Sequence, residues 1–278
     1  MTDAGIRIVK MSGAGNDFVL LGPDQTRQIA GHEEEWARRV CLRGLSVGAD
    51  GVLLVEAVGT DRVRVRFHNP DGSSAFCGNG SRCAARFAHA RGLAGATMTL
   101  ETASGDVTAE VFDDLVRLTL GPPVDRGELS LAIGESTLTG RRIVAGVPHF
   151  VVSAGDPATA PLERWGPAVR GHAIFGPRGT NLDVVGRCAD GAVTIRTWER
   201  GVERETLACG SGAVAAAFVA RLGGAAERVS VIAASGARLE VDLPGPPQAP
   251  EEARLTGDAR FVFEGRLDPE ALVGLPNG

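Results

Sequence analysis

The chain has 278 residues, of which 44% are hydrophobic and 23% charged, so it can bury a core and is not disordered by composition. Its formal net charge of −5 at pH 7 argues against binding to the phosphate backbone of a nucleic acid. No segment approaches the roughly 18 uninterrupted apolar residues of a membrane helix, and the N-terminus lacks an apolar signal core. We therefore expect a cytoplasmic protein with a small-molecule partner and with neither nucleic acid nor membrane as partner.

Most of the chain is predicted to form short strands, because β-branched or alternating residues recur between turn residues. One surface helix is predicted over 33–42, where the spacing is helical and acidic residues occupy the first turn. The proline-rich segment 244–250 predicts an exposed loop. In chain order the predicted strands are 6–11, 18–21, 52–55, 63–67, 97–101, 107–112, 116–120, 142–145, 150–153, 182–185, 193–198, 229–232, 239–243 and 261–264.

A short motif occurs twice. Cys-Gly-Asn-Gly at 77–80 precedes an alanine-rich run at 82–91, and Cys-Gly-Ser-Gly at 209–212 precedes a similar run at 213–222. A glycine follows each run, and this is typical of a helix C-terminus. A strand-like alternation and a polar loop precede both motifs, so the chain is predicted to contain two similar halves. The second run is apolar on every side, which predicts a helix wrapped by sheet.

These patterns predict an α+β fold with two pseudo-symmetric domains. Each domain is expected to be mostly antiparallel sheet wrapped around a central buried helix. The predicted limits are 1–122 for the first domain and 123–265 for the second, with the tail 266–278 able to pack back onto the first.

The five cysteines are odd in number and form no close CxxC pair, so neither a disulfide framework nor a metal site is expected. Cys41, Cys83 and Cys188 are interpreted as small buried hydrophobic residues. Cys77 and Cys209 differ because each directly precedes a predicted helix. Free N–H groups and the helix dipole at that place are expected to lower a thiol pKa.

Two such thiols, supplied by opposed halves of the molecule, predict two-base racemisation. One thiolate would remove a proton from a carbon, and the other thiol would return a proton from the opposite face. The helix starts would hold the carboxylate, so no cofactor is expected. No nucleotide-binding glycine motif is present. A thiol redox switch is the rival hypothesis, but it leaves the carboxylate-binding helix starts unexplained.

Several ordered motifs resemble those of diaminopimelate epimerases. They lie at 10–18, 48–51, 69–73, 77–80, 146–149, 179–181, 198–201 and 205–212, and the similarity runs from about residue 7 to 220. The resemblance implies a pyridoxal-independent epimerase that interconverts LL- and meso-diaminopimelate for lysine and peptidoglycan synthesis. It also implies two similar domains with the active site in the cleft between them, and a homodimer.

The resemblance also implies roles for particular residues. Cys77 and Cys209 match the two acid/base thiols, and His149 with Glu199 matches a polar pair that orients or tunes them. The residues that match substrate-binding groups are Asn16, Asn69, Gly78, Asn79, Asn181, Glu199, Arg200, Gly210 and Ser211. Taken without the resemblance, Asn16 or Asn69 could be turn residues, His149 a core histidine and Glu199-Arg200 a surface pair.

The chain departs from the family pattern at two substrate-facing positions. Val147 stands where the family often has asparagine, and Gly51 stands where some members have glutamine. Neither residue offers a side-chain hydrogen bond. Both thiols are kept, so the alternative is a racemase of another amino acid built on the same fold.

Overall fold

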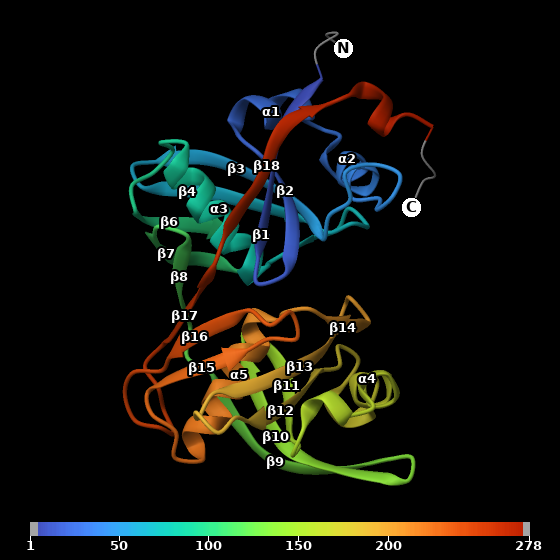
Figure 1. The fold of residues 1–278 in the computed structure, drawn as a ribbon, viewed down its shortest axis with the longest axis vertical. Helices are drawn as coiled ribbons and strands as arrows, with labels where there is room; N and C mark the ends of the chain where they lie inside the picture. Colours follow the sequence, from blue (N-terminus) through green and yellow to red (C-terminus); the bar gives the residue numbers. More distant parts are fainter. Residues whose placement is uncertain (1–4, 275–278) are drawn as a thin grey trace. The chain divides into compact units, whose positions relative to one another are not determined.

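The computed structural model describes residues 5–274, which divide into two compact units. Unit 1 comprises the described residues up to Leu118 together with those from Gly257 onward, and unit 2 comprises Thr119–Thr256. Both are mostly sheet with few helices (Figure 1). None of the helices in residues 5–274 is long and apolar enough to cross a membrane.

In unit 1, strand β1 pairs with both β18 and β2, and both pairings are antiparallel. β2 and β3 are parallel, β3 and β4 are antiparallel, and β4 pairs with β5 and with β6, which continues to β7. The strands are β1 Ile6–Gly13, β2 Asn16–Leu21, β3 Gly51–Gly59, β4 Arg62–His68, β5 Ser74–Ala75, β6 Thr97–Thr102, β7 Gly105–Phe112, β8 Leu115–Leu120 and β18 Arg260–Leu267. The helices are α1 Pro23–Gln28, α2 Glu33–Val40, α3 Gly78–Ala90 and the 3-10 helix η3 Pro269–Leu272.

Unit 2 repeats this order. β10 pairs antiparallel with β9 and β11, β11 is parallel to β12, and β13 pairs with β12, β14 and β15, which continues through β16 to β17. The strands are β9 Val124–Ile133, β10 Ser136–Ala145, β11 Val147–Ser153, β12 Asn181–Arg187, β13 Val193–Glu199, β14 Arg204–Thr206, β15 Arg228–Ile232, β16 Arg238–Asp242 and β17 Ala253–Asp258. The helices are η1 Pro157–Thr159, α4 Leu162–Arg170, η2 Ala173–Phe175 and α5 Gly210–Leu222.

The two units therefore share one succession of paired strands, with parallel pairs at the same two places. β2 corresponds to β11, β3 to β12, β4 to β13 and α3 to α5. This confirms the predicted α+β fold with a duplicated core of sheet around a helix.

Each sheet is covered by helices on two sides. α3 and α5 are the central helices, and most residues of both are buried, as the apolar runs predict. α2 packs Trp36 and Val40 against one sheet, while α4 packs Leu162 and Val169 against the other. Helix α2 agrees with the predicted surface helix, since its opposite side carries exposed acidic and basic residues.

Of the predicted tail 266–278, the described residues up to 274 lie with unit 1, and 275–278 lie outside the described residues. β18 pairs with β1, and Leu272 of η3 packs on the core beneath α2. The sequence predicted that the second domain ends at residue 265. In the structure unit 2 ends at Thr256, and β18, Arg260–Leu267, pairs with β1 of unit 1. β1 needs an outer partner just as β10 does, and β9 supplies it in unit 2.

One predicted core residue is not buried. Cys188 is half-exposed because it lies in the turn that joins β12 to β13, where its carbonyl accepts the N–H of Gly191. Cys41 and Cys83 are buried, as predicted.

Candidate active site

Three neighbouring strands of unit 2 place polar residues on one face. Side chains alternate between faces along a strand, and the register pairs His149 with Asn181 and Asp183 with Thr197. All four side chains therefore lie on the same face, at the end where α5 begins. The opposite face carries the apolar residues Phe150, Leu182 and Trp198, which pack in the core with α4.

A continuous chain of polar contacts leads from β12 to Cys209. Asp183 Oδ2 lies 2.7 Å from His149 Nδ1, and both side chains are fully buried. His149 Nε2 lies 3.0 Å from Ser211 Oγ, which is 3.4 Å from Cys209 Sγ. Thr197 Oγ1 donates to the second carboxylate oxygen of Asp183 at 2.7 Å. His149 and Ser211 were predicted from the sequence, whereas Asp183 and Thr197 were not.

Asn181 and Glu199 lie beside the same thiol, and Arg200 is joined to Asn181 through its backbone. Asn181 is buried, accepts the backbone N–H of Arg200 at 2.9 Å, and has its Nδ2 4.0 Å from Cys209 Sγ. Glu199 accepts the hydroxyl of Thr206 at 2.9 Å. The Arg200 guanidinium reaches the carbonyl of Arg178 at 3.3 Å in an exposed position. The structure thus brings together the predicted residues of this half.

In unit 1, Cys77 is the N-cap of α3. Its sulfur accepts the backbone N–H of Gly80 at 3.4 Å, so a helix-terminal N–H points at this thiol as the sequence predicts. Gly78 and Asn79 form the first turn of the helix. Asn79 Nδ2 donates to Asn16 Oδ1 at 2.6 Å, which joins the helix start to the beginning of β2.

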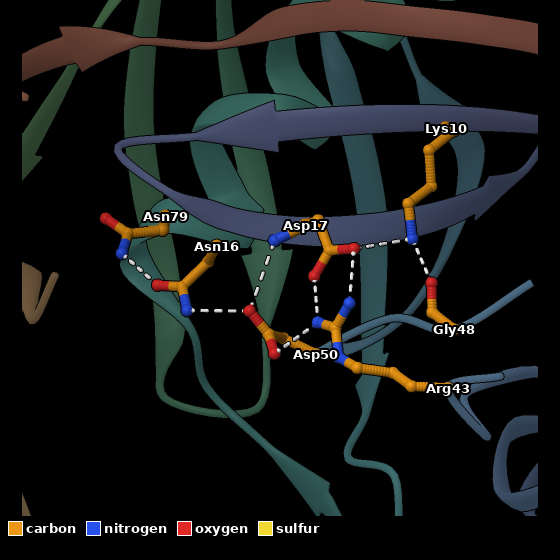
Figure 2. Close-up of polar contacts among 7 residues, drawn as sticks. All are labelled: Lys10, Asn16, Asp17, Arg43, Gly48, Asp50 and Asn79. Atoms are coloured by element: carbon orange, nitrogen blue, oxygen red, sulfur yellow. Dashed lines mark hydrogen bonds and ion pairs between the residues drawn. The ribbon is translucent and has the colours of Figure 1, made fainter. Parts of the chain in front are cut away.

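A charged network holds Asn16 in place (Figure 2). Asn16 Nδ2 donates to Asp50 at 2.9 Å, and Arg43 bridges the carboxylates of Asp50 and Asp17. Buried Lys10 pairs with Asp17 at 2.8 Å and also donates to the Gly48 carbonyl. Burial opposes ionisation of Asp17, but hydrogen bonds from Arg43 and Lys10 outweigh it and lower the pKa of this carboxyl group.

This network fixes the amide of Asn16. Ionised Asp50 can only accept, so Nδ2 of Asn16 must face it and Oδ1 must face Asn79. The motif at 48–51 contains Asp50, but its contact with Asn16 was not predicted. It arises because the backbone of Asp50 bonds to the Asp17 carbonyl at 2.8 Å, where β2 and β3 run parallel.

Asn69 lies in the turn between β4 and β5. Its Nδ2 donates to the hydroxyl of Ser73 at 3.0 Å, and Asp71 caps the same turn through the Ser73 N–H at 2.8 Å. The side chain of Asn69 stabilises this loop in the structure, as a turn asparagine does.

Both departures from the family motifs have a structural context. A Cβ at Gly51 would lie 2.2 Å from the Phe67 ring, so Phe67 takes the space that a larger residue would need. Val147 begins β11 opposite Ala145, just as Asn16 begins β2 opposite Gly13. The position that carries an amide in unit 1 is therefore apolar in unit 2.

Burial changes the acidity of three cysteines. Desolvation raises the pKa of Cys41 and of Cys83 to about 12. Burial also raises the pKa of Cys209, and the nearby charges of Glu199 and Asp183 add to the shift. The prediction of a lowered pKa is therefore wrong for Cys209 in this state, because loss of hydration and two carboxylates outweigh the helix start.

Among residues 5–274, no three His, Cys, Asp or Glu side chains lie close enough to hold a metal ion. Each unit instead offers a thiol at the start of a buried helix, with amide or hydroxyl groups beside it. A cysteine at the N-cap position of a buried helix in each half of a duplicated fold fits an epimerase or racemase, and the chain is an isomerase of this class.

The comparisons with known proteins agree. The family model for diaminopimelate epimerase matches residues 8–125 and 142–262. The diaminopimelate epimerase of Aquifex aeolicus is 39% identical over 277 residues, which cover 95% of this chain and 98% of that protein. That of Archaeoglobus fulgidus is 39% identical over 281 residues, covering 94% and 96%. The chain belongs to the diaminopimelate epimerase family.

Solved structures show the same fold at low identity. A hydroxyproline epimerase from Agrobacterium vitis, with trans-4-hydroxy-L-proline bound, has a TM-score of 0.73 at 17% identity. The match covers 97% of this chain and 94% of that protein. A methylitaconate-delta-isomerase has a TM-score of 0.62 at 13% identity, covering 99% and 98%.

We expect Cys41 and Cys83 to resist alkylation in the folded protein. With a pKa of about 12, each is thiolate in roughly one molecule in ten thousand at pH 8, and burial also blocks access. Iodoacetamide at pH 8, followed by peptide mass spectrometry, should label neither residue, whereas the same treatment in guanidinium should label both. Labelling of folded Cys83 at the rate of the unfolded chain would contradict this interpretation.

Proposed function

We propose that the chain converts LL-diaminopimelate to meso-diaminopimelate, with Cys77 and Cys209 as the acid/base pair and without pyridoxal phosphate. The observation that carries the proposal is a cysteine at the N-cap position of the central helix in both units of a chain that belongs to this family. The product would serve lysine and peptidoglycan synthesis, as the family name implies.

The reaction needs one base and one acid. The thiolate of one cysteine takes the α-proton and becomes a thiol, and the electron pair left on carbon is stabilised through the α-carboxylate. The second thiol then gives its proton to the opposite face of that carbon and becomes a thiolate. Atoms and charge balance, the configuration is inverted, and the two cysteines have exchanged protonation states.

The helix starts are proposed to hold the α-carboxylate. In α3 and α5 the first-turn N–H groups and the dipole favour an anion, and Gly78, Asn79, Gly210 and Ser211 lie there. A carboxylate held in this way gains stabilisation as charge develops on it, so the rate of proton removal rises.

The remaining predicted residues are proposed to bind the amino and distal groups. The ammonium groups of the substrate can donate hydrogen bonds to the side-chain oxygens of Asn16, Asn69, Asn181 and Glu199. Arg200 can pair with the distal carboxylate through its planar guanidinium. His149 is proposed to orient or tune Cys209, to which it connects through Ser211.

We predict that Cys77→Ala and Cys209→Ala each abolish epimerisation, because either direction requires both an acid and a base. The measurement is conversion of LL- to meso-diaminopimelate by the purified protein, resolved by chiral chromatography. Cys188→Ala is the matched control, because Cys188 lies in a half-exposed turn and should keep wild-type activity. Near-normal epimerisation by either alanine variant would reject the two-thiol reaction.

The same assay separates the alternatives. A wild-type protein that ignores diaminopimelate but exchanges the α-proton of a monocarboxylic amino acid would be a racemase of other specificity, consistent with Val147 and Gly51. A protein that exchanges no α-proton and instead forms a reversible disulfide on peroxide treatment would be a thiol switch.

We predict that Arg200→Ala lowers kcat/KM for LL-diaminopimelate roughly a hundredfold, because the distal carboxylate loses a charge-assisted partner worth a few kcal/mol. The effect should lie mainly in KM, and Arg200→Lys should restore part of it. Arg204→Ala is the control, since Arg204 is exposed on β14. Equal kinetics for Arg200→Ala and Arg204→Ala would remove Arg200 from the substrate site.

We propose that the protein is a cytoplasmic homodimer, as the resemblance implies. Val262 and Phe263 on β18 support a second copy, because these apolar side chains are 58% and 46% exposed. Light scattering should give twice the chain mass of 28.8 kDa. Val262→Lys with Phe263→Lys should yield monomer, and a wild-type protein that is already monomeric at micromolar concentration would refute the dimer.

A further inference from the structure

The two units differ at three equivalent strand positions. The third residue of β2, Phe18, pairs with the first residue of β3, just as the third residue of β11, His149, pairs with the first of β12. By the same register, the directly opposed pair Leu53 and Phe67 in unit 1 corresponds to Asp183 and Thr197 in unit 2. An apolar trio in one unit thus replaces a polar trio in the other.

In unit 1 the trio is ordinary core. The rings of Phe18 and Phe67 meet edge to face with centroids 6.0 Å apart, and Leu53 packs beneath Gly80 of α3. In unit 2 the corresponding helix residue is Gly212, whose Cβ would lie 2.8 Å from Asp183 Oδ1 and 3.1 Å from Thr197 Oγ1. The polar trio therefore lies directly under the helix start that carries Cys209.

The fold does not require this polar trio, because the apolar trio supports the same helix start in unit 1. Burying a carboxylate and an imidazole costs free energy unless all their hydrogen bonds are made. Asp183 makes two, to His149 and Thr197, and His149 continues to Ser211. This arrangement points to a role in the chemistry at Cys209.

We infer that Asp183 is a positioning residue that sets the direction of the hydrogen bonds through His149 and Ser211, so that Cys209 rests as a hydrogen-donating thiol. That Cys209 then serves as the acid of epimerisation rests on the proposed function. Both thiols face a helix-terminal N–H, that of Gly80 for Cys77 and that of Gly212 for Cys209, but among the contacts above only Cys209 also ends a hydrogen-bond chain that begins on a buried carboxylate. The two thiols of the duplicated fold are thus unequal before substrate binds.

The direction follows from what each atom can do. A carboxylate at Asp183 can only accept, so a neutral imidazole at His149 would carry its proton on Nδ1 and accept at Nε2. Ser211 then donates its hydroxyl proton to Nε2, and the Ser211 oxygen accepts the S–H of Cys209. Each link in the chain has one donor and one acceptor, and it ends on a protonated sulfur.

The titratable groups around Cys209 come from three strands. His149 lies on β11, Asp183 on β12 and Glu199 on β13, and both carboxylates disfavour a thiolate on Cys209. Glu199 acts on the sulfur by its charge, whereas Asp183 acts by its charge and by fixing the His149 tautomer. This difference makes Glu199 the matched comparison.

The test is the pH dependence of Cys209 alkylation in the ligand-free, full-length protein. Iodoacetamide is applied across a pH series, and the Cys209 and Cys77 peptides are quantified by mass spectrometry. In Asp183→Asn the amide oxygen can accept the Thr197 hydroxyl, as Asp183 Oδ1 does. The amide NH2 group then faces His149 Nδ1. His149 would then donate from Nε2, and Ser211 would donate toward sulfur and favour the thiolate.

We expect Asp183→Asn to lower the midpoint pH of Cys209 alkylation by at least one unit, which means about tenfold more thiolate at a given pH. Glu199→Gln should lower it by less. Cys77 should keep its midpoint in Asp183→Asn. Thr197→Ser keeps both charges and the hydroxyl that donates to Asp183, so it should stay near wild type. It controls for disturbed packing, since altered access changes the plateau rate and not the midpoint.

Two results would overturn the inference. An unchanged Cys209 midpoint in Asp183→Asn would show that the hydrogen-bond chain does not control the thiol. An equal or larger shift in Glu199→Gln would show that charge alone acts. A wild-type protein without epimerase activity would refute the proposed function, yet the alkylation midpoints would still decide the assignment of Asp183.

Discussion

Each half-site depends on the close approach of a helix start to the face of a sheet. Gly80 and Gly212 are the third residues of α3 and α5; Gly80 lies over Leu53, and Gly212 lies over the opposed pair Asp183 and Thr197. A Cβ at Gly212 would lie 2.8 Å from Asp183 Oδ1 and 3.1 Å from Thr197 Oγ1, so a side chain there would push the helix away from the sheet. With glycine in place, the thiol that precedes the helix is held at the end of the sheet face, where buried polar groups can reach it.

The same constraint allows the two halves to diverge. A helix start can rest on Leu53 or on Asp183 with no change in strand order, since only the side chains beneath the glycine differ. Duplication thus supplies two similar thiols, and substitutions beneath them make their surroundings unlike. Each thiol faces an N–H of its own helix start, and Cys209 in addition ends a chain of hydrogen bonds that begins on a buried carboxylate.

Local patterns in the sequence were sufficient to predict much of this arrangement. The alanine-rich run after Cys209 has no polar face, and the structure buries it within sheet. Most strands lie where alternation predicted them. The prediction omitted β9, although Leu129, Leu131 and Ile133 alternate in it, and it omitted the short helix α4, which contains Pro167.

What escaped prediction depends on contacts between distant residues. Asp183 lies 34 positions from His149, and only the parallel register of β11 and β12 brings the two together. Asp50 meets Asn16 for the same reason in unit 1. The raised pKa of Cys209 was also not predicted, because the desolvation that raises it comes from the packed surroundings and not from its helix position.

We propose that two thiols of unlike surroundings exchange a proton with one carbon. The most direct measurement follows LL-diaminopimelate in D2O at early conversion and uses mass spectrometry to count deuterium in substrate and product. The two-thiol reaction should give meso-diaminopimelate with one deuterium at the inverted carbon, because the donating thiol has exchanged with solvent. Unreacted LL-diaminopimelate should carry no deuterium. A product that keeps its original proton, or deuterium that enters the substrate as fast as the product, would indicate a single base and would contradict the claim.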